Sequence, residues 1–157
     1  MNSEQLRERI GDPSWVLDPI IEIGGVMKAV ILSADGMQVG KSDNTSNDDG
    51  DRIAAMSSSL QGAARAAAVV ALDAPEDSPA STITVELEAP RKQSTDERKL
   101  IGRLTLMPAG RDTNAFIAVA YSPETPMGLI AHAMARQAKN LGEALMSVSA
   151  RTADATS

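Results

Sequence analysis

Two segments of this chain are apolar at consecutive positions, and this feature limits the possible folds most strongly. Residues 26–33 contain three aliphatic side chains in a row, and residues 115–121 are apolar almost throughout. Successive side chains of a strand point to opposite faces of its sheet, so strands of this kind are buried on both faces. A sheet with two such central strands needs helices over both of its faces.

The remaining strands are predicted from shorter patterns. A turn signal at residues 34–36 predicts a hairpin with a short return strand, and leucines at 100, 104 and 106 predict a strand later in the chain. Residues 82–88 alternate strictly between aliphatic and polar side chains. A strand with one polar face favours an antiparallel sheet whose surface is solvated or meets a partner. The aliphatic face of this strand consists of Ile83, Val85 and Leu87.

Three segments have helical periodicity. The first follows Asp12-Pro13 and contains Pro19, which should break or restart the helix. The second carries a narrow apolar seam at spacings of three and four residues, and the third begins near Met127. The predicted order is therefore helix, two strands, helix, three strands, helix, which is an α+β arrangement. The seam of the second helix consists of Ile53, Met56, Leu60, Ala63, Ala67 and Val70.

The 157 residues are expected to form one domain. We predict a flexible lead-in over residues 1–12, the folded domain over residues 13–146, and a disordered tail over residues 147–157, where the side chains are small and polar. The polar first ten residues lack the apolar stretch of a signal peptide, so a cytoplasmic protein is expected.

The composition argues against several functional classes. The net charge is −6, which disfavours binding to nucleic acid. The chain has no cysteine, one histidine and three aromatic residues, so thiol chemistry is excluded and a catalytic site is disfavoured. We predict no cofactor and no metal. The lone His132 is best interpreted as a surface or partly buried residue of the last helix. Gly40-Lys41-Ser42 lacks the preceding glycine and the following helix of a phosphate-binding loop.

Several stretches resemble, in register, the bacterial branch of the roadblock / dynein light chain family. They are the Trp-Val-Leu-Asp of residues 15–18, the Gly-Val and Ser-Ala-Asp-Gly hairpin of residues 23–37, the helix of residues 51–65, and the start of the last helix at residues 127–134. The resemblance covers roughly residues 14–146. Pro19 departs from the family pattern, and the loops at 73–80 and 89–99 are long.

The resemblance implies a five-stranded antiparallel sheet with the second helix on one face and the first and third helices on the other. It also implies a homodimer, in which the third strands pair edge to edge and the second helices pack together. An exposed strand edge is a liability unless it is covered, which agrees with this expectation. The dimer interface residues implied for this chain are Ile53, Met56, Leu60, Ala63, Ala67, Thr82, Thr84 and Glu86.

Family members that look like this chain are similar to regulators of small Ras-like GTPases, so the resemblance implies a non-enzymatic, protein-binding function of that kind. A sensor-kinase-like protein is a further partner that the resemblance allows. A scaffold subunit without effect on nucleotide turnover is the alternative, and an enzyme of unknown type is disfavoured by the composition. The residues expected to contact the GTPase, each of which could equally be plain helix surface, are Asp51, Arg52, Ser58, Gln61 and Arg65.

Overall fold

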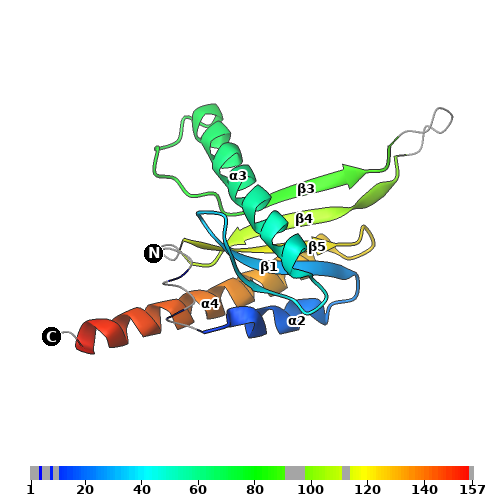
Figure 1. Cartoon of the computed structure of the whole chain (residues 1–157). Coiled ribbons are helices and arrows are strands. Elements are labelled where there is room, and N and C mark those ends of the chain that lie inside the picture. The colour runs from blue at the N-terminus through cyan, green and yellow to red at the C-terminus, as the bar shows by residue number, and fades with distance from the viewer. Residues whose placement is uncertain (1–3, 5–7, 9–10, 91–97, 111–113, 156–157) are drawn as a thin grey trace.

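The computed structural model describes residues 4, 8, 11–90, 98–110 and 114–155. Within them the chain forms a five-stranded antiparallel sheet in the order β2-β1-β5-β4-β3, with helices on both faces (Figure 1). The helical elements are the 3-10 helix η1 (Pro13–Leu17) and the α-helices α2 (Asp18–Ile21), α3 (Asn47–Ala71) and α4 (Met127–Ala155). The strands are β1 (Val26–Ser33), β2 (Gln38–Lys41), β3 (Ile83–Glu88), β4 (Leu100–Pro108) and β5 (Ala115–Tyr121). The predicted α+β fold class is confirmed.

The two strands that were predicted to be buried on both faces lie at the centre of the sheet. β1 and β5 pair along their full length, from Val26 opposite Tyr121 to Ser33 opposite Ala115. β3 pairs with β4 from Ile83 opposite Leu106 onward, and it forms one edge of the sheet.

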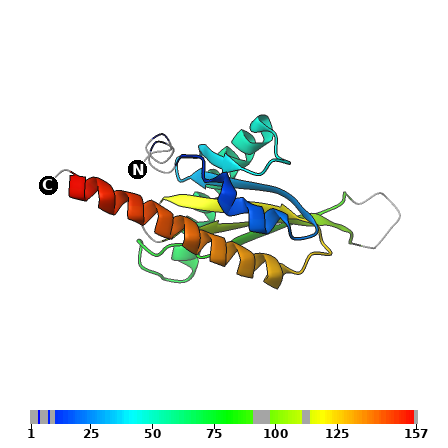
Figure 2. The ribbon, with the colours of Figure 1, turned by 90° about the horizontal axis from the view of Figure 1, so that it is seen from below.

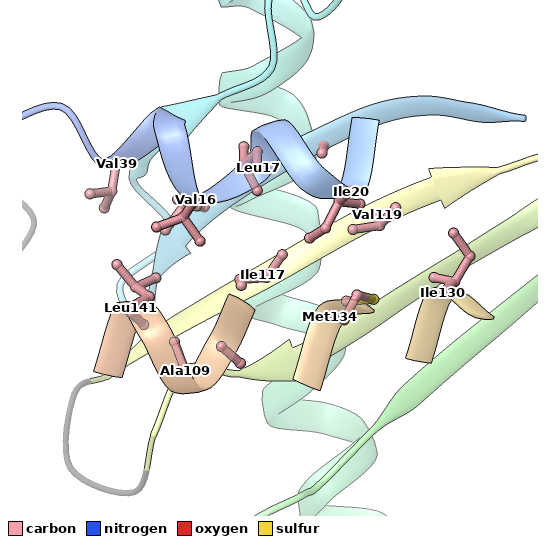
Figure 3. Close-up of a cluster of buried hydrophobic side chains, with 14 of the residues drawn as sticks. Val16, Leu17, Ile20, Val39, Ala109, Ile117, Val119, Ile130, Met134 and Leu141 are labelled. Carbon is pink, nitrogen blue, oxygen red and sulfur yellow. The ribbon is translucent and has the colours of Figure 1, made fainter. Parts of the chain in front are cut away.

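The two faces of the sheet are covered unequally. α3 lies on one face, and η1, α2 and α4 lie on the other (Figures 1 and 2). The larger core cluster fills the second face, where Val16 of η1 and Ile20 of α2 approach Ile117 and Val119 of β5, with Met134 of α4 opposite (Figure 3). The cluster under α3 contains fewer fully buried side chains, namely Val30, Leu32, Ala54, Leu106 and Ala118.

The first helical segment is interrupted at the place that Pro19 predicts. Asp12 caps η1, because its carboxylate accepts a hydrogen bond from the Ser14 amide at 3.0 Å. A 3-10 helix then gives way to the single turn of α2, with Pro19 in that turn. A proline in the first turn costs no helical hydrogen bond, so the chain restarts its helix there.

The last helix is longer than predicted. Residues 147–155 continue α4 to Ala155, whereas we expected a disordered tail from residue 147. Adding residues to a helix that is already packed costs little, and the alanines at 150, 153 and 155 are strong helix formers. Residues 156 and 157, and most of the predicted lead-in over residues 1–12, lie outside the described residues.

Candidate functional site

The candidate site is the surface that α3 leaves open on its own side of the sheet. α3 packs on β1, β2 and β5. It crosses the sheet obliquely, and its C-terminal end reaches beyond the strands (Figure 1). α3 therefore covers only part of the β3 and β4 side chains that lie on its side of the sheet. Val85 and Leu104 are half-buried, and Leu87 is 60% exposed.

The predicted apolar seam of α3 faces outward. Met56 is 69% exposed, Ala63 and Ala67 are also exposed, and Ile53 and Leu60 are half-buried at the margin. The side of α3 that rests on the sheet is instead formed by small residues, with Ala54 and Ser57 fully buried. Contiguous exposed apolar side chains of this kind are typical of surfaces that contact another protein.

A shallow apolar groove of about 270 Å³ runs between this seam and the sheet. Its floor includes Leu104 of β4, and its walls are made by side chains of α3. Arg52 is the only charged residue among the described residues that line the groove, so the groove suits apolar side chains of a partner. The lining residues are Arg52, Ile53, Met56, Ser57, Leu60 and Leu104.

The β3 edge lies beside this groove. Within the described part of the chain, β3 pairs with β4 alone, so its outer edge has no strand next to it. Glu86 is held by Arg103, whose Nε donates to Glu86 Oε1 at 2.8 Å. Thr84 and Thr105 are joined through their hydroxyls at 3.0 Å. These contacts tie β3 to β4, and no described strand pairs with its outer edge.

The structure places the predicted interface residues in two adjoining groups. The helix residues form the exposed seam of α3, and the strand residues lie at the β3 edge. Thr82 precedes β3 by one residue, and Thr84 and Glu86 lie within it on the face that is directed away from α3. The features that sequence reasoning missed are the groove floor at Leu104 and the inward stripe of Ala54 and Ser57. Small side chains repeating at helical spacing are the only sequence signal for that stripe.

The five residues predicted to contact a GTPase do not share one surface. Asp51 and Arg52 are exposed near the start of α3. Ser58 donates its hydroxyl hydrogen to the Ala34 carbonyl oxygen at 2.6 Å, across the gap to the β1–β2 turn. Arg65 and Gln61 are half-buried, and both lie against the loop that leads into β3.

Arg65 connects α3 to the loop that leads into β3. Its Nε donates to the carbonyl oxygen of Ser78 at 2.8 Å, and its Nη2 donates to the carbonyl oxygen of Glu76. Gln61 and Arg65 together line a cavity of about 490 Å³ between α3, this loop and the end of β4. Arg65 therefore holds a loop in place, which helical periodicity alone does not reveal.

The start of α3 is fixed electrostatically. The Ser46 hydroxyl caps the helix by accepting from the Asp49 amide at 3.1 Å. Lys28 Nζ on β1 lies 2.6 Å from Asp49 Oδ2. The hydrogen bond from Lys28, together with its positive charge, lowers the pKa of Asp49 below its ordinary value.

The residues that were considered for phosphate binding have structural roles. Lys41 ends β2, and its ammonium donates to the Thr45 carbonyl oxygen at 2.7 Å. The Ser42 hydroxyl accepts from the Ala29 amide at 3.1 Å and lies 2.7 Å from that of Thr45. Both side chains hold the loop between β2 and α3. His132 lies exposed on α4.

Among the described residues, no group of three histidine, aspartate or glutamate side chains is arranged to hold a metal ion. No described helix is both long and apolar enough to cross a bilayer.

Comparison with known proteins agrees with the fold. The family model of the Roadblock/LC7 domain matches residues 15–76, which span η1 to the loop after α3. No curated protein sequence matches the chain significantly.

Solved structures match over nearly the whole fold. A Roadblock/LC7 domain from Streptomyces avermitilis is 23% identical, with a TM-score of 0.71 over 87% of this chain and 99% of that one. Myxococcus xanthus MglB is 13% identical, with a TM-score of 0.62 over 86% and 95% of the two chains. An MglB with a tetrameric arrangement is 16% identical, with a TM-score of 0.61 over 88% and 93%. At these identities the likeness concerns the fold.

Proposed function

We propose that this chain, whose residues 15–76 match the Roadblock/LC7 domain model, is a homodimeric, non-enzymatic, cytoplasmic protein-binding module that regulates or scaffolds a small Ras-like GTPase. The observation that carries the proposal is the exposed apolar seam of α3 beside the unpaired edge of β3. The two features lie on one side of one molecule, so a single partner surface can cover both.

The partner that fits this surface is a second copy of the chain. A twofold axis makes each patch meet its own counterpart, which suits an apolar helix face and an open strand edge. Pairing the two β3 strands would satisfy their outer backbone groups and join the sheets into one. The seam alanines would let the two α3 helices approach closely, because small side chains leave room for the facing backbone. The proposed interface residues are Ile53, Met56, Leu60, Ala63, Ala67, Thr82, Thr84 and Glu86.

The dimer would present a continuous platform built from the exposed starts of its two α3 helices. Asp51 and Arg52 are exposed there, and we propose that they contact the GTPase directly. Ser58 and Arg65 are bound to their own chain, and Gln61 lines a cavity of it, so these three would influence a partner by supporting the platform.

Binding and nucleotide turnover together test this function. The Ras-like GTPase encoded closest to this chain in its genome would be titrated with the purified protein by calorimetry, and its single-turnover GTP hydrolysis would be followed with and without the protein. We expect binding that Arg52→Glu weakens and that Arg136→Glu, on the exposed surface of α4, leaves unchanged.

The outcomes separate the two forms of the proposal. A change in hydrolysis rate supports regulation, and binding without such a change supports a scaffold. The GTPase assignment fails if neither binding nor a rate effect is found. Sedimentation equilibrium that shows only a 16.4 kDa species at micromolar concentration would refute the homodimer.

A further inference from the structure

The β3 strand has a pattern that discriminates between the possible ways of pairing it with a second copy. Its aliphatic side chains lie on the side of α3, and its threonine and glutamate side chains lie on the other side. An antiparallel pair with a perpendicular twofold axis places residues of like face opposite each other, so the pairing must be centred on a residue of the strand. The candidate centres are Thr84, Val85 and Glu86.

We propose that two copies pair in the register centred on Val85, an inference that rests on the proposed homodimer. This register puts Val85 opposite its own counterpart, Ile83 opposite Leu87, and Thr84 opposite Glu86. Five of the six residues of β3 then face a residue of the partner's β3. Each aliphatic side chain meets an aliphatic side chain, which is the favourable kind of cross-strand pair.

The charges and the exposed leucine exclude the neighbouring registers. Centring on Glu86 would place two carboxylates directly opposite each other, and like charges in that position destabilise a sheet. Centring on Thr84 would leave Leu87, which is 60% exposed in the single chain, opposite Ser81 before the strand. Of these three registers, only the one centred on Val85 both covers Leu87 with an aliphatic side chain and keeps the two Glu86 carboxylates from facing each other. Each Glu86 would also keep its own ion pair with Arg103.

Cysteine cross-linking can identify the register, because the natural chain contains no cysteine. A disulfide needs Cα atoms within about 7 Å, and directly opposed residues of an antiparallel pair are about 4.5–5.5 Å apart. In the Val85 register, the two copies of residue 84 or of residue 86 are diagonal neighbours, about 7–8 Å apart, which is too far for an unstrained bridge. Single-cysteine variants Val85→Cys, Thr84→Cys and Glu86→Cys would be oxidised with copper phenanthroline and separated on non-reducing gels. Lys139→Cys, on the exposed surface of α4, is the control for random collision.

We expect most of the Val85→Cys protein to become a disulfide-linked dimer, while the other three variants stay largely unlinked. Preferential linking of Thr84→Cys or Glu86→Cys would overturn the register and leave a β3-paired dimer standing. No linking in a protein that still sediments as a dimer would overturn β3 pairing itself. Equal linking of Lys139→Cys would show collision only and would overturn the inference. A monomeric wild-type protein would refute the homodimer from which the register follows.

Discussion

Replacing Met56 by alanine is the most direct test of the α3 seam. A fully buried methionine side chain is worth about 1.5–3 kcal/mol, and Met56 is still 69% exposed in the single chain, so covering it should add about 1–2 kcal/mol per copy. Because both copies carry the substitution, Met56→Ala should weaken the free energy of dimerisation by about 2–4 kcal/mol. This raises the dissociation constant of the dimer roughly 30- to 700-fold. The stability of the monomer should change little, because the side chain makes few contacts within its own chain.

The assay is sedimentation velocity over a dilution series. Met146→Ala is a matched control, since Met146 is 67% exposed and lies on α4, away from the seam. Urea denaturation of both variants would establish that the monomer fold is retained. If Met56→Ala and Met146→Ala dissociate at the same concentration as the wild-type protein, the seam of α3 is not part of the interface.

Three further substitutions test contacts within the chain. Arg65→Ala removes two hydrogen bonds to the loop before β3, so we expect faster amide exchange over residues 76–80 and a free energy of unfolding lower by about 1–3 kcal/mol. The control is Arg52→Ala, at an exposed position of α3, which should change neither quantity. Equal amide exchange in the two variants would contradict the role assigned to Arg65. Gly25→Ala should lower the free energy of unfolding, measured by urea denaturation, by roughly 2–4 kcal/mol, because φ is +92° there and a methyl group would overlap the hydroxyls of the loop before α4. Gly24→Ala is the control, because there is open space around that residue. Equal stability of the two variants would show that the loop moves to make room for the methyl group. Asp49→Asn should be less stable than the wild-type protein at neutral pH. The pKa of the Asp49 carboxyl is lowered in the folded protein, so its contribution to stability is complete above its pKa in the unfolded chain and disappears as the pH falls through its pKa in the folded protein. The difference in free energy of unfolding between the two proteins should therefore shrink in acid. A difference that does not depend on pH would contradict the ion pair as its cause.

Much of the fold follows from local patterns. The runs of consecutive apolar residues identified β1 and β5 as central strands, and strict alternation identified β3 as a strand with one polar face. Helical spacing located α3 and the buried face of α4, and Pro19 located the break between η1 and α2. These features could be predicted because strand and helix periodicity are properties of neighbouring residues.

The direction in which α3 faces could not be predicted in the same way. The apolar seam was expected between subunits or beneath them. In the single chain, the buried stripe is the weaker one of Ala54 and Ser57. A small side chain becomes buried when a strand passes close to it, and here those strands lie outside the helix itself.

The same reason explains why the residues that were expected on one binding surface do not lie together. Asp51 and Arg52 remain exposed, whereas Ser58 and Arg65 bond to carbonyl oxygens of turns and loops elsewhere in the chain. The sequence by itself determined the elements, their order and the existence of an unusual apolar seam. Only the tertiary structure decided which side of α3 is free, because the rotation of a helix about its axis is set by packing against segments that the local pattern does not contain.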